Sequence, residues 1–534
     1  VWDRVLFTAI REQENLSMFL NTTMHDVDTE GHRITAIHCY QMTTEIEWTL
    51  RAPVFCDCTG NGTLGFMAGM PFRTGSEGKE EYQEPHAPEQ PDQHRMGNTL
   101  LFKAVDRGHP VAFVPPKGSY TFTEEQLRYR KHADAKPLFG VLEAENKADP
   151  ILDNVDNTTK DMVFDAYCLD YGYWWIELTG EKADIIEEYE DIRDELIKCV
   201  YGVWDHIKNG GDHGAQNFDL EWVGMLPGVR ESRRMEGEYM LNENDLLENR
   251  VFDDAVAYGG WPVDNHVEHG LLDFDKMPSE IYAFNGLYTI PYRSYVAKDM
   301  DNLFIGGRSM GASKLAMASS RVMGTCAVGG QAVGTAAALC KKYGCTPHDV
   351  EAHMKELQQL LLKDDCYIPG YKNEDPADLA RTAQVSAGSE KQPAANVING
   401  VSRTVGEDEN CWQSDGLAGD NGVLSLKWDV PHTLRQVRLT FDPNLCSSIK
   451  ITLSSKRIAE QVPGVPPELV RDYDVELLKD GHVLASRSVR GNYQRLNVLN
   501  FDACDCDEVR LHVLATNGIA DARVYEVRAY EQAD

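Results

Sequence analysis

Long apolar runs are missing from this chain. No stretch approaches the roughly 18 consecutive apolar residues that a membrane-spanning helix needs, and no secretory leader pattern is visible. The sequence starts at Val1 rather than at a methionine and within a helical pattern, so we expect further residues before it in the natural protein. We therefore predict no membrane partner and make no prediction of cellular location.

Basic residues are also scarce. The 534 residues include 52 Lys and Arg against 85 Asp and Glu, a formal net charge of −33. Because binding to DNA or RNA needs a basic face, this charge argues against a nucleic-acid partner. At about 150 residues per domain, the length predicts two to four domains.

Cysteines with the spacing of a zinc site are lacking as well. Of the 13 cysteines, Cys56 and Cys58 are separated by one residue, as are Cys504 and Cys506. Zinc sites favour two to four residues between paired cysteines. We expect no metal site and mostly free, buried thiols, which are typical of a reducing compartment.

What the sequence does contain is an α/β pattern over its first two thirds. Alternating or apolar runs predict strands over residues 22–27, 32–39, 45–50, 52–58 and 302–307. Helical periodicity predicts helices over residues 1–14, 184–209, 319–342 and 346–362, with Gly344 ending the third of these. The proline-rich stretch 80–95 is expected to be a loop.

The pattern changes after residues 364–378. Long helices give way to short alternating segments at 424–430, 433–441, 449–454, 473–479, 483–489, 508–513 and 523–530. Turn residues separate these segments. This arrangement predicts an antiparallel β-sandwich.

A glycine-rich loop follows the strand predicted at 52–58. The residues from Gly60 to Gly65, G-N-G-T-L-G, match G-x-G-x-x-G, in which backbone N–H groups hold a phosphate. A short helix is expected at 63–70. No second strand follows within about 30 residues, so no complete βαβ unit is evident. A tight turn without a ligand therefore stays an alternative.

Four motifs in order resemble the FAD-dependent oxidoreductase family of two-dinucleotide-binding-domain flavoproteins. The D-C-T-G-N-G of residues 57–62 is similar to that family's A-T-G-D-G turn. The other three are GVRESRRMEGEYMLNENDLL (228–247), YGGWPVDNH (258–266) and the segment 290–339, which contains IGGRSMGASKLAMASSRVMG. The resemblance spans residues 1–371 and implies FAD as the cofactor of the full-length protein. The family's N-terminal G-x-G-x-x-G unit has no counterpart here.

The resemblance implies a domain plan. An incomplete, Rossmann-like FAD-binding domain is expected over 1–72 and 286–372, with an inserted α+β substrate region over 73–285. A linker (373–381) then leads to an all-β jelly-roll sandwich over 382–534.

Cofactor contacts are implied at the glycine turns and at the start of the long helix. The residues are Thr59, Gly60, Asn61, Gly62, Gly306, Gly307, Arg308, Ser320 and Arg321. The helix is expected to begin near Ala318, where unpaired N–H groups would face the negative charge of reduced flavin. Gly330 and Gly334 are expected to pack against a sheet instead.

Candidate catalytic residues lie in the two middle motifs. His266, two residues after Asp264, is a candidate acid or base, and Arg230 and Arg234 are candidates for binding an anionic group. The wall of the substrate or flavin pocket is predicted to include Trp261, Asp264, Arg233 and Arg293. The alternatives are an ordinary polar loop and structural ion pairs of the arginines with Glu236, Glu238 or Asp245.

The C-terminal segments resemble discoidin-like, galactose-binding-like modules. The resemblance is carried by NCWQSDG (410–416) and the closing ARVYEVRAYE (522–531). It implies carbohydrate binding, for which Trp412 and Arg438 are the candidates. A docking domain without a ligand is the alternative.

The leading hypothesis is a FAD-dependent oxidoreductase that acts on a small polar, sugar-derived substrate by hydride transfer to flavin. The alternative is a non-catalytic carbohydrate-binding protein whose sandwich is the functional part. A third is that a second polypeptide supplies the missing phosphate loop. The sequence leaves open whether the chain forms a homo-oligomer.

Overall fold

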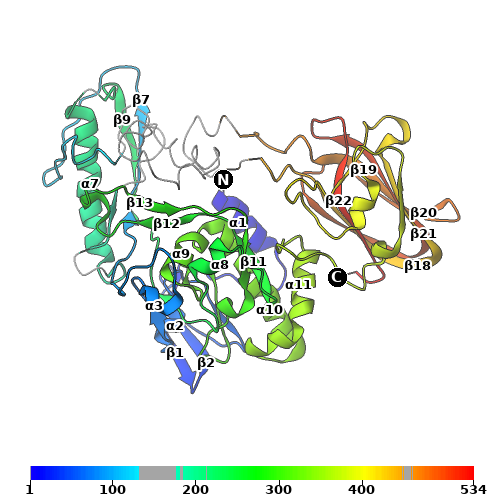
Figure 1. The fold of residues 1–534 in the computed structure, drawn as a ribbon, viewed down its shortest axis with the longest axis horizontal. Helices are drawn as coiled ribbons and strands as arrows, with labels where there is room; N and C mark the ends of the chain where they lie inside the picture. The colour runs from blue at the N-terminus through cyan, green and yellow to red at the C-terminus, as the bar shows by residue number, and fades with distance from the viewer. Residues whose placement is uncertain are drawn as a thin grey trace. The chain divides into compact units, whose positions relative to one another are not determined.

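The structure is a computed structural model that describes residues 2–130, 176–180, 184–211, 213–447, 449, 459 and 461–533. The chain forms two compact units, each assembled from segments that are distant in sequence. Figure 1 labels many of the helices and strands named below. Unit 1 comprises Val1–Asn98, Leu178–Ile192 and Gly228–Met354. Unit 2 comprises Thr99–Glu177, Arg193–Pro227 and Lys355–Asp534.

A helix and a three-stranded antiparallel sheet open unit 1. They are α1 (Trp2–Glu12), β1 (Thr22–Glu30), β2 (Arg33–Gln41) and β3 (Ile46–Leu50), with the strands in that order. Successive side chains of a strand point to opposite faces, and β2 buries Ile34 and Ala36 in this way. The predicted first helix and the strands at 22–27, 32–39 and 45–50 are confirmed.

A parallel pair of strands forms the centre of unit 1. β4 (Phe55–Asp57) pairs with β15 (Leu303–Ile305), as the strands predicted at 52–58 and 302–307 require. Asn302 fixes this pair, because its Nδ2 donates to the carbonyls of Ile34 and Pro53. A wider Rossmann-like sheet stays a prediction.

The long helix predicted over 319–342 is two helices. α9 (Lys314–Ser320) ends before a break at Arg321 and Val322, and α10 (Met323–Tyr343) follows. The prediction that one helix begins near Ala318 is therefore wrong, since Ala318 lies in the last turn of α9. The break forms because Val322 takes an extended conformation, which suits a β-branched residue. The predicted stop at Gly344 is confirmed by its left-handed conformation, with φ 63°.

By length and composition alone, α10 is a helix that could cross a membrane. The expectation concerned consecutive apolar residues, and α10 has no such run, because glycine, threonine and glutamine interrupt it. The core helix of a soluble protein passes the same test. Ala332, Val333, Ala336 and Leu339 of α10 are buried in that way.

Short elements complete unit 1. The helices are α2 (Thr63–Met67), α3 (Lys79–Tyr82), α8 (Glu243–Leu247) and the 3-10 turns η1 (Gly270–Leu272), η2 (Tyr292–Tyr295), η3 (Gly307–Ser309) and η4 (His348–His353). The strands are β5 (Phe72–Arg73), β10 (Arg234–Met235), β11 (Ala255–Gly259), β12 (Val263–His266), β13 (Ser279–Tyr282) and β14 (Tyr288–Pro291). β6 (Asn98–Thr99) and β8 (Glu177–Leu178) stand where the chain passes between the units. The stretch 80–95, expected to be all loop, thus begins within a one-turn helix.

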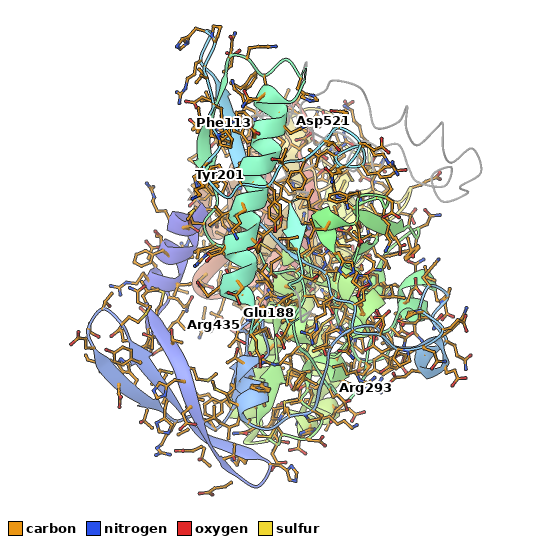
Figure 2. The ribbon with its side chains drawn as sticks, turned by 90° about the vertical axis from the view of Figure 1, so that its left-hand side faces the viewer. Phe113, Glu188, Tyr201, Arg293, Arg435 and Asp521 are labelled. Carbon is orange, nitrogen blue, oxygen red and sulfur yellow. The ribbon has the colours of Figure 1, made fainter. Side chains whose placement is uncertain are left out.

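Helix α7 (Tyr189–Asn209) belongs to unit 2 from Arg193 onward, and there it packs on the antiparallel strands β7 (Phe102–Asp106) and β9 (Phe218–Val223). Trp204 is fully buried, and its ring meets that of Phe102 edge-on at 5.5 Å. Figure 2 labels Tyr201 on this helix and Phe113 near it. The helix begins at Tyr189, five residues after its predicted start.

A seven-stranded antiparallel sheet forms the rest of unit 2. Its strands are β16 (Gln384–Ala387), β17 (Trp412–Gln413), β18 (Val423–Phe441), β19 (Val470–Lys479), β20 (His482–Val489), β21 (Leu496–Thr516) and β22 (Arg523–Tyr530). The order is β17-β22-β18-β21-β19-β20, with β16 also on β18.

The two longest strands fold this sheet over one core. β18 changes register between Lys427 and His432, pairing with β16 before that point and with β22 after it. Leu426 and Leu439, from the two halves of β18, share the core with Val475. The predicted all-antiparallel region is confirmed, but the segments 424–430 and 433–441 are one bent strand. The strand predicted at 449–454 lies outside the described residues.

The residues predicted as a linker are anchored to this sheet. They follow α11 (Met354–Lys363) and include part of η5 (Leu379–Thr382); η6 (Ala394–Ile398) and η7 (Gly419–Gly422) lie further on. Asp378 Oδ1 accepts a hydrogen bond of 3.0 Å from the backbone N–H of Ala529 in β22. Because Asp378 is itself buried, the segment 373–381 packs as part of unit 2.

Candidate functional site

The glycine turn after β4 is organised by one buried carboxylate. Asp57 Oδ1 accepts hydrogen bonds from the backbone N–H and the hydroxyl of Thr59, and its Oδ2 accepts from the N–H of Gly65. The hydroxyl oxygen of Thr59 in turn accepts from the N–H of Thr63, in the first turn of α2. These bonds hold the turn in place without a ligand.

Two glycines of the turn have close neighbours. Gly60 has φ 76°, and a Cβ there would meet the Arg308 guanidinium at 2.9 Å. Gly62 has φ 61°, and a Cβ there would meet Met235 Sδ at 2.5 Å. Glycine is needed at both positions because side chains disfavour positive φ and because no space is left for one.

The second glycine pair brings Arg308 to this turn. A Cβ on Gly306 would meet Cys58 Sγ at 2.6 Å, so the backbones after β4 and β15 approach closely. Gly307 has φ 73° and faces open space. Arg308 then donates to Asn61 Oδ1 at 3.1 Å, and its burial lowers the pKa of its guanidinium. The structure thus brings together the predicted residues of the two glycine segments.

The start of α10 lies beside the same groups. Cys326 lies in the first turn of α10. Burial has the largest effect on its thiol and raises its pKa, while the charges of Arg308, Arg321 and Cys58 also act on it. Val322 caps the helix without a side-chain hydrogen bond. Nothing among the described residues lies within 4 Å of a Cβ added at Gly324. The first backbone N–H groups of α10 therefore sit beside open space.

The packing glycine of α10 is not one of those predicted. Gly330 and Gly334 have nothing within 4 Å of an added Cβ, so the expectation that they pack against a sheet is wrong. Gly329 has that role, because a Cβ there would meet the Tyr295 hydroxyl at 2.4 Å. Gly330 and Gly334 are four residues apart and share one face of the helix, whereas Gly329 is buried.

Three predicted residues form one cluster behind the start of α10. His266 Nε2 and Asp264 Oδ2 are 3.2 Å apart, and Arg321 donates to the same oxygen at 3.2 Å. Ser279 donates to the other oxygen of Asp264. Burial alone would raise the pKa of Asp264, but the charges and hydrogen bonds of His266 and Arg321 outweigh it and hold the pKa well below its ordinary value.

Trp261 and Ser320 stand next to this cluster. The Trp261 carbonyl accepts a hydrogen bond from the Ser319 hydroxyl, while its indole Nε1–H is buried with no partner among the described residues. Arg308 Nε is likewise buried without a hydrogen-bond partner among the described residues. Ser320 is buried at the end of α9, and its carbonyl accepts from Cys326 Sγ. Orphaned buried donors of this kind suit a ligand with hydrogen-bond acceptors.

The arginines of the R-E-S-R-R motif have separate tasks. Arg230 donates to the carbonyl of Gly97, and Arg233 donates to that of Asn61 while covering the ring of Phe66. Arg234 is buried and pairs with Glu77 and Glu231 at 2.8 Å each. The structural ion pairing foreseen for this motif is present, but its acidic partners are not Glu236, Glu238 or Asp245. Arg234 holds the fold and Arg233 touches the glycine turn.

Arg293 takes no part in the cluster. It lies in η2, where its Nε donates to Asp254 at 2.9 Å and its guanidinium lies over the ring of Tyr239. Its side chain is 40% exposed. Arg293 is predicted to line the substrate or flavin pocket, but its side chain contacts Asp254 and Tyr239 instead.

A model of the family described as FAD dependent oxidoreductase matches residues 1–361, more than half of the chain. The chain belongs to this family. FAD is the family's cofactor, and the residues here fit such a group. The buried donors of Trp261 and Arg308 have no partner among the described residues, Gly307 faces open space, and the first turn of α10 has no side-chain cap.

The FAD-dependent oxidoreductase matches no curated protein. Solved structures that match include the lectin domain of lectinolysin with Lewis B antigen, at 15% identity, covering 30% of this chain and 99% of that one with a TM-score of 0.22. A Streptococcus pneumoniae fucose binding module matches at 9%, covering 30% and 100% with 0.23. The family 32 module of C. perfringens NanJ in complex with galactose matches at 17%, covering 29% and 98% with 0.21.

The two carbohydrate candidates of the oxidoreductase are corrected by its structure. Trp412 is fully buried in the core of the sheet, with its indole N–H donating to the carbonyl of Ser389. Arg438 is 4% exposed and donates to Asp364 and to the carbonyl of Lys363. Neither side chain is available to a sugar, because each is committed to packing within unit 2.

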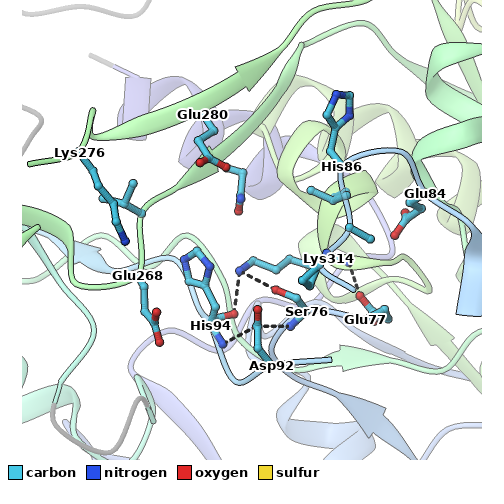
Figure 3. A pocket seen from close by; sticks show the side chains of 15 residues that line it. Ser76, Glu77, Glu84, His86, Asp92, His94, Glu268, Lys276, Glu280 and Lys314 are labelled. Atoms are coloured by element: carbon cyan, nitrogen blue, oxygen red, sulfur yellow. Dashed lines mark hydrogen bonds between the residues drawn. The ribbon is translucent and has the colours of Figure 1, made fainter. Parts of the chain in front are cut away.

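Sequence reasoning missed a polar cavity in unit 1 of the oxidoreductase. It has a volume of about 240 Å³ and gathers Lys314, Glu84, His94 and Asn265 from distant parts of the chain (Figure 3). Lys314 is buried, and its Nζ donates to the His94 carbonyl at 2.7 Å. Burial raises the pKa of Glu84 to about 7 and lowers that of His94 to about 4. No local motif signals this cavity, since its residues are up to about 240 positions apart.

Proposed function

We propose that this FAD-dependent oxidoreductase holds flavin between the glycine turn and the first turn of α10, and oxidises a small polar substrate there. When bound, the flavin supplies the acceptor for a hydride. The chain supplies a place that orients both molecules and a group that exchanges the accompanying proton. The observation that carries the proposal is the position of the Asp264–His266–Arg321 cluster beside the uncapped start of α10.

The start of α10 supports the cofactor half of the proposal. A helix of 21 residues has about half a positive charge at its N-terminus, carried by its first unpaired N–H groups. In most helices a side chain accepts from one of them, but Val322 cannot. Negative charge on a reduced flavin ring would be stabilised at this position, and Arg308 adds a second positive group nearby.

His266 is the acid–base candidate. Its carboxylate partner, Asp264, is held by Arg321 and Ser279, so the imidazole is oriented by a group that cannot itself rotate away. A positioned histidine of this kind takes up the proton of a substrate hydroxyl as the hydride leaves the adjacent carbon. Trp261 contributes a donor to the substrate or to the ring.

The substrate class is a small polar molecule, and a sugar-derived alcohol fits it best. Arg233, Arg308 and Arg321 surround the place with guanidinium groups, which bind hydroxyl and carboxylate oxygens. The alternative of a non-catalytic carbohydrate-binding protein has less support, because Trp412 and Arg438 are both buried.

Two glycine substitutions in α10 test the proposal. Gly324 and Gly334 both face open space on the same helix, but only Gly324 is in the first turn. Gly324→Glu places a carboxylate where flavin charge is stabilised, and we expect it to weaken FAD binding about tenfold or more. Gly334→Glu makes the same change three turns away and is expected to leave affinity within about twofold.

FAD affinity is measured by quenching of flavin fluorescence on titration into the full chain. Bound FAD in the wild type, weakened by Gly324→Glu alone, supports the proposed position. No binding by the wild type, or equal effects of the two substitutions, overturns it.

A further inference from the structure

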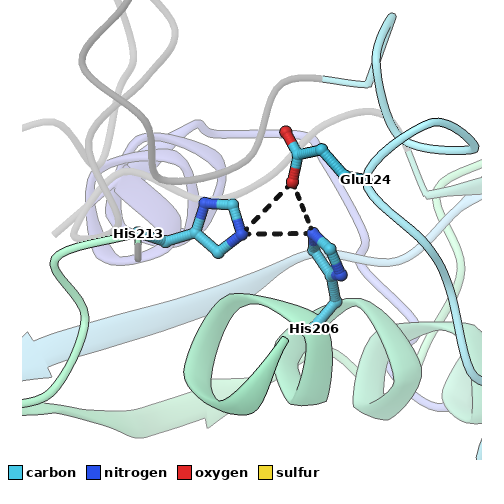
Figure 4. Close-up of side chains that lie close together, drawn as sticks. All are labelled: Glu124, His206 and His213. Atoms are coloured by element: carbon cyan, nitrogen blue, oxygen red, sulfur yellow. Dashed lines mark hydrogen bonds and ion pairs between the residues drawn. The ribbon is translucent and has the colours of Figure 1, made fainter. Parts of the chain in front are cut away.

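Two histidines and a glutamate of unit 2, none of them part of the flavin motifs, converge on one point. They are Glu124, His206 and His213 (Figure 4). His206 Nε2 lies 3.0 Å from Glu124 Oε2 and 3.2 Å from His213 Nε2, and His213 Nε2 lies 3.4 Å from the same glutamate oxygen. Both imidazoles are buried, and Glu124 faces solvent.

The end of α7 presents the two histidines. His206 lies in its last turn, and Gly210 lets the chain turn back close over it, since a Cβ there would meet His206 Nδ1 at 2.7 Å. Lys208 fixes the returning strand, because its Nζ donates to the carbonyls of Ala215, Gln216 and Phe218 at 2.8–2.9 Å. His213 is thereby held against His206.

Glu124 is placed by a reciprocal turn. The Thr123 hydroxyl accepts from the N–H of Gln126, and Gln126 Oε1 accepts from the N–H of Thr123. The turn is pinned by Leu127, which is fully buried. The exposed glutamate therefore stands on an ordered support rather than on a free loop.

The hydrogen-bond pattern of His206 leaves a lone pair at the centre of the cluster. Its Nδ1 lies 3.0 Å from the carbonyl of Phe122, which can only accept, so Nδ1 carries the proton. Nε2 of a neutral His206 is then an acceptor, and it faces the carboxylate of Glu124. A carbonyl on the outer nitrogen is also the usual support of a metal-bound histidine.

The three separations match the face of a metal tetrahedron. Zinc lies about 2.0–2.1 Å from histidine nitrogens and carboxylate oxygens, which places neighbouring ligand atoms about 3.3–3.4 Å apart. The observed 3.0, 3.2 and 3.4 Å agree with this spacing. We propose that Glu124, His206 and His213 bind a divalent transition-metal ion, Zn²⁺ first, with water at the remaining position on the solvent side.

This proposed site differs from the prediction of no metal site, which rested on paired cysteines with further Cys or His nearby. Imidazole and carboxylate ligands suit Zn²⁺ better than Ca²⁺ or Mg²⁺, which prefer oxygen ligands alone. The ion ties the turn of Glu124 to the end of α7 and so stabilises this part of unit 2. The proposal is independent of flavin binding.

Zinc content and affinity of the full chain test the proposal. We expect one Zn²⁺ per chain after dialysis, removable by a chelator with a fall in thermal midpoint. Co²⁺ in its place is expected to give visible absorption bands of a four-coordinate site. Glu124→Ala and His213→Gln should each weaken Zn²⁺ binding by about 10–100-fold or more. Glu125→Ala, the neighbouring exposed glutamate that pairs with Arg128, is the matched control.

Glu124 is exposed, so we expect Glu124→Ala to fold. It therefore tests the metal site even if a histidine variant does not fold. Unchanged Zn²⁺ affinity in Glu124→Ala, or an effect equal to that of Glu125→Ala, overturns the site. So does a wild-type chain that binds no Zn²⁺ or Co²⁺.

Discussion

Two buried histidines of this protein each meet a carboxylate, and the third member of each group differs. In unit 1, Asp264 bonds to His266 and to Arg321. In unit 2, Glu124 lies beside His206 and a second imidazole, His213. An arginine brings its own positive charge and only donates hydrogen bonds, whereas a neutral imidazole offers a lone pair.

The difference determines what each cluster can do. With Arg321 present, the charge of Asp264 is compensated inside the chain, and His266 is held in one orientation, as its proposed role in proton exchange requires. With His213 in place of an arginine, three electron-pair donors point at one position, which is the arrangement of a metal site. Under the two proposals, the same carboxylate–histidine contact serves acid–base chemistry in one unit and cation binding in the other.

Removing the histidine of the first cluster should have the largest effect. His266→Gln keeps a hydrogen-bonding side chain of similar size but removes the base, so we expect flavin reduction to slow by about 10²–10⁴-fold. FAD affinity should stay within about twofold of the wild type. Anaerobic stopped-flow reduction by a hexose that reduces the wild-type flavin measures the rate.

The pH profile separates catalysis from positioning in this variant. A wild-type rate that rises with pH as a histidine deprotonates, and a flat profile in His266→Gln, support a base. A rate within about threefold of the wild type would remove His266 from the mechanism.

Converting the second cluster into the first type tests the comparison itself. His213→Arg puts a guanidinium beside Glu124 and His206, so it should cost about 100-fold or more in Zn²⁺ affinity while leaving the chain folded. Isothermal titration with Zn²⁺ and a thermal melt of the same sample measure both properties. Retained Zn²⁺ binding would show that the third group does not decide the function of such a cluster.

Local spacing explains which parts of these clusters the sequence predicts. His266 and Asp264 are two residues apart on β12, so they share a face of the strand and their pairing follows from the sequence. The glycine turn follows from Gly60 and Gly62 after an apolar strand. The antiparallel sheet of unit 2 likewise follows from alternation and turn residues.

Long-range packing explains what the sequence does not predict. Glu124 and His206 are 82 residues apart, and no spacing rule joins them. In the sequence, Trp412 is an aromatic residue within a polar segment, as is typical of sugar-binding loops. In the fold its side chain is fully buried. The break between α9 and α10 depends on the conformation of one residue, Val322, inside a pattern that is helical on both sides.

The polar cavity of unit 1 holds a carboxyl group and a histidine in a third way, as separate residues of its lining. Glu84 has neither an arginine nor a metal as its main support, and burial raises its pKa from 4.5 to about 7. His94, in the same cavity, is pushed the other way by burial and by Lys314, from 6.5 to about 4. Both groups therefore favour the neutral form, in contrast to Asp264.

These two shifts have opposite effects on stability between pH 4.5 and 6.5. The raised pKa of Glu84 makes its contribution fully present below pH 4.5 and lost as pH rises through 7. The lowered pKa of His94 makes its contribution present above pH 6.5 and lost as pH falls toward 4. In the wild type these two contributions nearly cancel, so this cavity adds little to the change of unfolding free energy with pH.

Removing either group should reveal how the other makes the free energy of unfolding depend on pH. In Glu84→Gln the free energy of unfolding should rise by about 2–3 kcal/mol between pH 4.5 and 6.5, since one pKa unit corresponds to about 1.36 kcal/mol. In His94→Gln it should fall by a similar amount over the same range. Urea denaturation at three pH values, compared with the wild type at each, measures the differences. If the free energy of unfolding depended on pH in the same way in both variants, neither group would change its protonation on folding. Burial alone would then not distinguish this cavity from the Asp264 cluster.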